Sequence, residues 1–205
     1  DNVGFENCDL SSVQFDQTNV TKADFTQANI TAATFDRVMF TDSDLSALQF
    51  TDVKQTATDF QGCNLNSTVF NNSILNTVNF KDCQLDAANF DAAELSNVSF
   101  ENIEPRILNL GSARTEGLRW SGVTLQGDNV YKGDYSGVDF SHTDLSGIDL
   151  RQCIFENTDF SEANLSGANL EGVNLKGANL RACTLTGASL DQVCLFYTSP
   201  CPRTS

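Results

Sequence analysis

Large apolar residues occupy every fifth position of this chain, from Phe5 to Leu195, without a change of phase. Only three of these central positions hold something else: Gln55, Pro105 and Thr115. A second series, two residues before each centre, is mostly Ala, Val, Cys, Thr and Ser. The other three positions of each pentad are mostly polar and hold nearly all the charge. A period of five fits neither a helix of period 3.6 nor a long strand of period 2. The pattern therefore predicts short β-segments joined by a bend every five residues, with one large and one small side chain per pentad pointing inward.

If four pentads form one coil, residues 20 apart stack on successive coils at a spacing of about 4.8 Å. One such column holds seven consecutive aromatic residues: Phe40, Phe60, Phe80, Phe100, Trp120, Phe140 and Phe160. This regularity favours a coil of 20 residues. Because Trp120 lies in the column, we expect the coils to continue through the less regular residues before it.

The pentads follow the consensus A-[ND]-[LF]-[ST]-G, most plainly at residues 163–172, A-N-L-S-G-A-N-L-E-G. This closely resembles the pentapeptide-repeat family, and the resemblance covers residues 1–195. It implies an all-β fold, a right-handed quadrilateral β-helix with four pentads per coil and about ten coils. We therefore expect one β-helix domain over 1–195, with an irregular stretch at 101–135. Residues 196–205 are expected to form a C-terminal tail that caps the last coil.

Charged residues obey the same lattice. Opposite charges 20 residues apart predict exposed cross-coil ion pairs: Lys81–Glu101, Asp86–Arg106, Glu94–Arg114, Arg119–Asp139, Arg151–Glu171 and Glu156–Lys176. Acids also stack on acids, at Asp16/Asp36, Asp24/Asp44 and Asp139/Asp159. Two alternatives stay open for these acidic pairs: solvated repulsion that a stable rod tolerates, or recruitment of a divalent cation by the carboxylates.

The seven cysteines fall into two groups. Five occupy the small inward position and are expected to be buried free thiols: Cys8, Cys63, Cys83, Cys153 and Cys183. The stacked pair Cys63 and Cys83 has a spacing that permits a disulfide, although parallel side chains aim poorly for one. Cys194 instead sits at an outward position, and Cys201 lies in the tail. A disulfide between Cys194 and Cys201 would fold the tail over the end of the rod.

Such a disulfide would place the protein in an oxidising compartment, such as the thylakoid lumen or the periplasm. Seven free thiols would remove this argument and leave a cytoplasmic location open. Because the chain begins at Asp1 rather than Met, we expect a processed or trimmed form.

The chain has 27 acidic and 12 basic residues, and a net charge of −15. This charge makes direct binding to nucleic-acid phosphates or anionic membranes unfavourable, because Lys and Arg carry that affinity. No apolar run approaches the roughly 20 residues of a membrane-spanning helix, so no membrane insertion is expected.

Catalytic chemistry finds little support. His142 is the only histidine and has no second His or cluster of outward Cys beside it, as a zinc site or a catalytic triad would need. The carboxylates are spread around the predicted coil, so no glycosidase-type pair can be singled out, and no phosphate-binding glycine motif is present. We expect no catalytic residue, no metal, no cofactor and no enzyme activity.

The irregular positions are the best candidates for a binding site. Asp128 occupies an inward position, which predicts that residues 126–134 bulge outward. That bulge would present a candidate interaction surface formed by Asp128, Asn129, Tyr131 and Lys132. A bulge that only relieves packing is the alternative.

Two functions are compatible with the sequence. The family resemblance implies a non-catalytic structural or protein-interaction scaffold, as in cyanobacterial and chloroplast members, with an unidentified protein partner and a monomeric or end-to-end dimeric state. The alternative, also taken from the family, is a DNA mimic that binds DNA gyrase or another DNA-binding protein. Three observations favour the scaffold. The acids from residue 6 onward divide 7, 6, 7 and 6 among the four sides, so they form no concentrated stripe. The unbroken five-residue phase leaves no room for the long inserted loops of the gyrase-binding members, and the tail is too short for their C-terminal helical dimerisation module.

Overall fold

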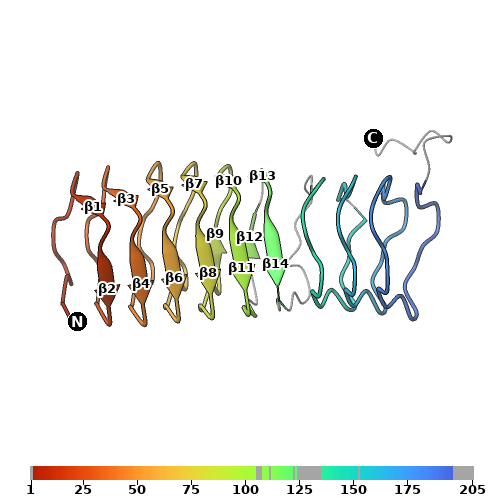
Figure 1. The fold of residues 1–205 in the computed structure, drawn as a ribbon, viewed down its shortest axis with the longest axis horizontal. Helices are drawn as coiled ribbons and strands as arrows, with labels where there is room; N and C mark the ends of the chain where they lie inside the picture. The colour runs from red at the N-terminus through yellow and green to blue at the C-terminus, as the bar shows by residue number, and fades with distance from the viewer. Residues whose placement is uncertain are drawn as a thin grey trace.

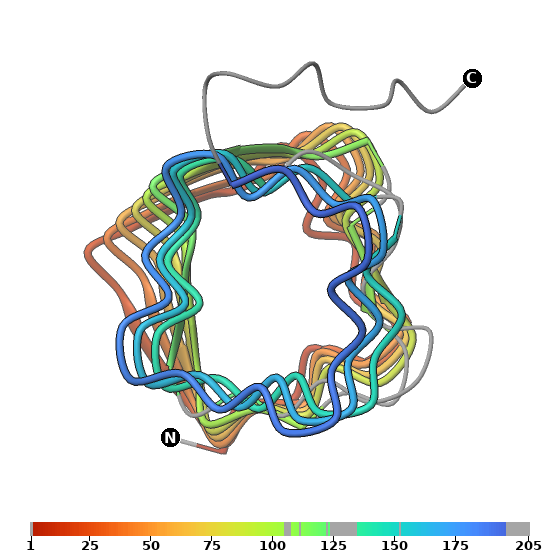
Figure 2. The ribbon, with the colours of Figure 1, turned by 90° about the vertical axis from the view of Figure 1, so that its right-hand side faces the viewer.

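The fold was analysed in a computed structural model that describes residues 2–104, 108–110, 112–121, 123, 135–151 and 153–195. It is a rod of stacked coils, with the first coil at one end and residues 176–195 at the other (Figure 1). Viewed along its axis, each coil has a four-sided outline (Figure 2). The described residues contain β-strands and turns but no helix, and all described strand pairs are parallel. The protein is thus an all-β parallel solenoid, and the predicted fold class is confirmed.

We number the four sides of the coil by their central residues. Pentads centred at residue 5 and every twentieth residue after it form the first side, and those centred in the same way at 10, 15 and 20 form the second, third and fourth sides. The third side carries one six-stranded sheet: β1 (Gln14–Asp16), β3 (Thr34–Asp36), β5 (Lys54–Thr56), β7 (Ile74–Asn76), β10 (Glu94–Ser96) and β13 (Arg114–Glu116). The fourth side carries another: β2 (Asn19–Thr21), β4 (Met39–Thr41), β6 (Asp59–Gln61), β8 (Asn79–Lys81), β11 (Ser99–Glu101) and β14 (Arg119–Ser121). The second side has a short pair, β9 (Ala88–Asn89) and β12 (Leu108–Asn109).

The register is 20 residues throughout. Phe15 pairs with Phe35 in β1 and β3, and single parallel bridges carry the same offset from Gly4↔Asp24 to Asn174↔Cys194. At this offset, the bridges from residue 4 to residue 194 span roughly the predicted ten coils, whereas the strands of the described residues all lie within residues 14–121.

A turn at each corner explains the five-residue period. At nearly all described corners, the residue two after the centre has a positive φ, for example Ala32 at 56° and Gly147 at 69°. The amide three residues after a centre then donates to the carbonyl of that centre, as in Ala33 N to Ile30 O at 2.9 Å. This left-handed residue turns the chain before the next small side chain points inward, which is why glycine suits the last position of the consensus.

Central side chains fill the interior. From Phe25 to Leu175, the described central residues are at most 4% exposed, apart from the partly exposed Thr115. The aromatic column on the fourth side stacks from Phe40 to Phe160 with ring centroids 4.6–5.9 Å apart. Burial along the whole axis, rather than one compact core, therefore stabilises the rod.

Two of the predicted interruptions lie within the described residues, and neither breaks the coil. Gln55 is fully buried in β5, between Phe35 and Leu75 on the neighbouring coils. Thr115 pairs with Leu95 between β13 and β10. The third interruption, Pro105, lies outside the described residues.

Candidate functional site

The predicted interaction bulge of Asp128, Asn129, Tyr131 and Lys132 lies outside the described residues and stays a prediction. The structure describes the coils on either side of it. Two hollows lie between these coils. One of about 320 Å³ is lined by Ser99, Phe100, Glu101, Arg119, Trp120, Asp139 and Ser141, and one of about 230 Å³ is lined by Ala113, Arg114, Thr115 and Ser136.

The carboxylates that line the larger hollow already have structural partners. Glu101 accepts from Lys81 Nζ at 2.9 Å, and Asp139 Oδ1 accepts from the backbone amide of Ser141 at 2.9 Å. A general base needs an acceptor directed at a nucleophile or a substrate. These contacts instead direct the carboxylates along the surface of the rod.

Two predicted cross-coil ion pairs are confirmed: Lys81–Glu101 at 2.9 Å and Arg114–Glu94 at 3.0 Å. The predicted ion pair between Arg151 and Glu171 is wrong, because Arg151 pairs with a different acid. Both Nε and Nη2 of Arg151 contact the carboxylate of Asp149, two residues earlier in the same coil, with Nη2 at 2.8 Å. This two-point contact with a planar carboxylate satisfies the guanidinium better than one contact across coils.

Of the remaining three predicted ion pairs, Arg119–Asp139 is not formed, whereas Asp86–Arg106 and Glu156–Lys176 stay predictions. Arg119 and Asp139 form a parallel backbone bridge, but the ion pairs described for the chain do not include them. Glu156 accepts from Asn174 Nδ2 at 2.7 Å. Arg106, the expected partner of Asp86, lies outside the described residues.

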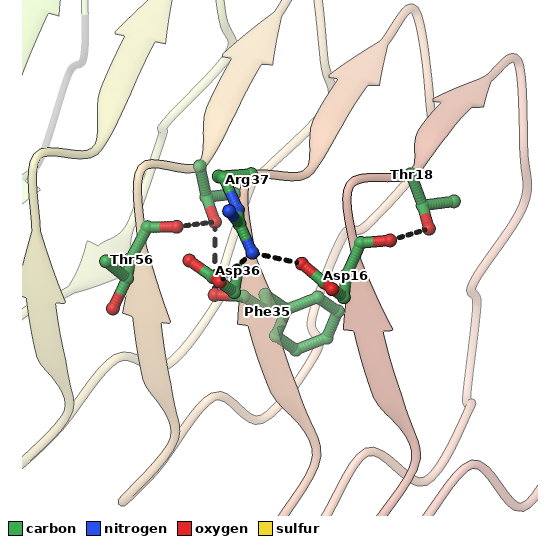
Figure 3. Close-up of polar contacts among 7 residues, drawn as sticks. Asp16, Thr18, Phe35, Asp36, Arg37 and Thr56 are labelled. Carbon is green, nitrogen blue, oxygen red and sulfur yellow. Dashed lines mark hydrogen bonds and ion pairs between the residues drawn. The ribbon is translucent and has the colours of Figure 1, made fainter.

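The repulsion between Asp16 and Asp36 is relieved by an arginine, a contact that the sequence did not predict. Arg37 Nη2 lies 2.8 Å from Asp16 Oδ1 and 2.9 Å from Asp36 Oδ2, so one guanidinium bridges both acids across the coils (Figure 3). The lattice argument missed this bridge because Arg37 lies at the corner, outside the 20-residue column of the two acids. A second cross-coil contact that the sequence did not predict joins His142 Nδ1 and Glu162 Oε2 at 3.3 Å.

The acidic pairs Asp24/Asp44 and Asp139/Asp159 are held by hydrogen bonds. In each acid, Oδ1 accepts from the backbone amide two residues later, at 2.8–2.9 Å. An asparagine on the next coil also donates its Nδ2 to Asp44 and to Asp159. The side-chain and backbone hydrogen bonds from Thr26 hold the pKa of Asp24 below its usual value. Among the described residues, no group of three or more His, Cys, Asp or Glu could hold a metal ion.

Five cysteines are free thiols, including Cys63 and Cys83, so the possible disulfide between these two is absent. The hydrogen bond with Cys63, together with burial, raises the pKa of the Cys83 thiol. Cys194 is not among the free thiols and is only 7% exposed, although its lattice position is outward. Cys201 lies outside the described residues, so the Cys194–Cys201 disulfide stays a prediction.

Counting basic as well as acidic residues corrects the expectation of an even charge. By pentad position in the sequence, the first and second sides hold three bases, Arg106, Lys132 and Arg151. At the described positions, these two sides carry twelve acids and one base, Arg151. The third and fourth sides carry twelve acids and eight bases: Lys22, Arg37, Lys54, Lys81, Arg114, Arg119, Lys176 and Arg181. We call the first and second sides the acidic half and the third and fourth sides the mixed half. The sequence argument compared only acids and therefore missed the segregation of the bases.

Solved structures with the same repeat resemble this chain. HetL, a pentapeptide repeat protein involved in heterocyst differentiation regulation from the cyanobacterium Nostoc sp. strain PCC 7120, is 20% identical with a TM-score of 0.51, and the match covers 95% of this chain and 92% of HetL. QnrB1, a plasmid-mediated fluoroquinolone resistance protein, is 15% identical with a TM-score of 0.44, over 85% and 92% of the two chains. A pentapeptide repeat protein of the Arabidopsis thaliana thylakoid lumen is 20% identical with a TM-score of 0.16, over 73% and 63%. At these identities the likeness to HetL shows the fold alone.

No curated protein matches the chain. No helix in the part of the chain that the structure describes is long and apolar enough to cross a membrane. Family models give the identification. The model for a pentapeptide repeat region matches residues 1–80, 33–104 and 73–150, and the model for eight copies of the pentapeptide repeat matches 136–172 and 163–196. Together with the 20-residue register and the filled four-sided interior, these matches show that the chain belongs to the pentapeptide-repeat family.

Proposed function

We propose that this protein is a non-catalytic scaffold that binds a protein partner through the outer surface of the rod, as a monomer or an end-to-end dimer. The observation that carries the proposal is the use of the inward side chains. From Phe25 to Leu175, the described central residues are at most 4% exposed, apart from Thr115, so these coils offer no lumen for a substrate. Most outward side chains are polar, and many are fixed by hydrogen bonds along the coils. A rigid outer surface of this kind loses little conformational entropy when a partner binds.

Affinity capture tests this function. The tagged chain serves as bait in an extract of the source organism, and a second pentapeptide-repeat rod of similar charge serves as control bait. The proposal expects a protein that is retained by this chain and not by the control bait, and that binds again after purification. A turnover activity of the purified chain alone, or purified candidates that never rebind, would contradict it.

We also propose that Cys194 pairs with Cys201 and that the protein matures in an oxidising compartment, with the thylakoid lumen or the periplasm favoured. Support comes from Cys194, which is buried at an outward position and is not a free thiol. A tail bonded to Cys194 would account for this burial. Thiol titration of the unfolded chain tests the pairing: five reactive thiols are expected before reduction and seven after it, whereas seven before reduction would refute it.

The acidic half favours a second candidate, the DNA mimic, because a protein that binds DNA also attracts a surface rich in carboxylates. A gyrase supercoiling assay with a fluoroquinolone present separates the two. The mimic would inhibit supercoiling or protect the enzyme from the drug. The scaffold proposal expects neither effect.

A further inference from the structure

The segregation of charge extends along the whole described rod. Acids of the acidic half occur from the first coil to the last: Glu6, Asp9, Asp24, Asp44, Asp52, Asp86, Asp91, Glu104, Asp144, Asp149, Glu171 and Asp191. Because the mixed half holds the same number of acids, its eight bases account for the difference in net charge. Two adjacent sides of one rod thus carry a strong negative charge, while the other two are largely neutralised.

The ion pairs follow the same division. Arg37, Lys81, Arg114 and His142 make their described contacts with acids of the mixed half. Of the ion pairs that the structure describes, only Arg151–Asp149 belongs to the acidic half. The described ion pairs therefore neutralise more of the charge on the mixed half than on the acidic half.

Carboxylates of the acidic half are nevertheless held in place. Oδ1 of Asp9, Asp24, Asp44 and Asp144 accepts from the backbone amide two residues later, at 2.8–3.0 Å. An asparagine on the next coil also donates its Nδ2 to Oδ1 of Asp9, Asp44 and Asp144. Fixed carboxylates lose little side-chain entropy on binding a cationic group, and neutral backbone donors leave their charge in place.

We propose that the acidic half is the docking surface of the scaffold, and that its occupant is an extended segment of a partner protein rich in Lys or Arg. This inference rests on the proposed scaffold function and names the chemistry of its partner. Charge complementarity selects the occupant, because anionic partners are repelled and an apolar segment would find polar side chains on these sides.

The dimensions fit an extended segment. The acids of this half span roughly nine coil-to-coil steps of about 4.8 Å, or about 45 Å along the rod. An extended chain advances about 3.3–3.6 Å per residue. A segment of about 13 residues along the two sides could therefore place its cationic side chains near acids of successive coils.

Two variants of equal net charge test the proposal. The acidic-half triple variant is Asp24→Asn, Asp44→Asn and Asp144→Asn, and the mixed-half triple variant is Asp59→Asn, Asp139→Asn and Asp159→Asn. All six acids precede a central residue, a position that asparagine occupies in many other pentads. Binding of a fluorescent dodecalysine peptide is measured by anisotropy at several salt concentrations, after circular dichroism has shown that each variant is folded.

We expect the acidic-half triple variant to bind dodecalysine about tenfold more weakly than the unmodified chain, and the mixed-half triple variant to bind within about threefold of it. The salt dependence should weaken only in the acidic-half variant. Equal losses in both variants would mean that net charge alone attracts the peptide, and would overturn the proposal. A larger loss in the mixed-half variant would also overturn it.

The same variants separate this inference from the scaffold function. A captured partner that is lost with the mixed-half variant and kept with the acidic-half variant would refute the docking surface while the scaffold function stands. Failure to obtain any partner that rebinds the unmodified chain, by contrast, counts against the scaffold function itself.

Discussion

Two kinds of residue in this rod work against its stability. Gln55 lies in the fully buried column of the third side, and neither its amide oxygen nor its amide nitrogen has a hydrogen-bond partner among the described residues. The corners are the second case, because many in the N-terminal half place residues other than glycine at positive φ. Each cost is local, so single substitutions can measure it.

Replacing Gln55 with leucine should raise the free energy of unfolding by about 1–3 kcal/mol, because a buried amide without a partner is replaced by an apolar side chain of similar size. Denaturant unfolding measures the change. Leu75→Gln, one coil away in the same column, is the matched control and should lower stability. An unchanged or lower stability of Gln55→Leu would show that the amide has a partner.

Ala32→Gly should raise the free energy of unfolding by about 1 kcal/mol, because the left-handed conformation costs a residue with a Cβ roughly that much. Gly147→Ala should lower it by a similar amount. A Cβ at Gly147 would meet no atom within 4 Å, so its effect comes from the backbone alone. Ala33→Gly, beside Ala32 at a buried inward position, should instead destabilise the rod. Equal effects of the changes at 32 and 33 would contradict this explanation.

At the scale of the coil, two kinds of contact stabilise acids that stack on successive coils. One is a hydrogen bond from the backbone or from an asparagine side chain, and the other is an arginine that bridges two carboxylates. Aspartates before a central residue accept from the side-chain hydroxyl and the backbone amide of the residue two later, and these bonds lower the pKa of Asp9, Asp24 and Asp159. Arg37 joins two acids that the sequence alone places in direct repulsion. The repeat therefore tolerates acids on successive coils as long as each carboxylate finds a donor.

The lowered pKa values predict acid sensitivity. A carboxyl group whose pKa is lower in the folded state than in the unfolded state stabilises the fold above the unfolded value, which is about 3.9 for Asp. This stabilisation is lost as the pH falls through the folded pKa. The melting temperature should therefore be nearly constant between about pH 7 and 5 and should fall below about pH 4.

Asp24→Asn tests the source of this dependence, since asparagine keeps the acceptor and cannot titrate in this range. Its melting temperature, followed by circular dichroism, should fall less steeply below pH 4 than that of the unmodified chain. Asp52→Asn is the control, an acid for which no such hydrogen bond is described. The same slope in Asp24→Asn and the unmodified chain would contradict the assignment.

Arg37→Gln should lower the melting temperature, because it leaves Asp16 and Asp36 in mutual repulsion. The side chains of Arg37, Asp16 and Asp36 are about half exposed. The stability lost in Arg37→Gln should therefore be smaller than the stability gained in Gln55→Leu. Added salt should reduce this loss of stability. Combining Arg37→Gln with Asp16→Asn removes the repulsion and should restore most of the loss. A loss that neither salt nor the second substitution changes would point to packing of the arginine stem instead.

At the scale of the whole molecule, the fold followed from the sequence to an unusual degree. A five-residue period and one aromatic column predicted the 20-residue register, because every coil repeats the same local geometry. The ion pairs were less predictable. Arg151 pairs with Asp149 in its own coil, and Arg37 contacts Asp16 from a corner position outside the column of that acid. The difference in charge between the two halves was also missed, since it requires acids and bases to be placed on the sides together.

Carboxylate footprinting of the complex between this chain and its captured partner tests the central claim most directly. Carbodiimide labelling and mass spectrometry would compare the modification rates of Asp24, Asp44 and Asp144 with those of Asp59, Asp139 and Asp159, with and without the partner. A scaffold that docks a basic segment on its acidic half predicts slower labelling of the first three acids and little change in the other three. Protection of the mixed half instead, or equal protection of both halves, would contradict it.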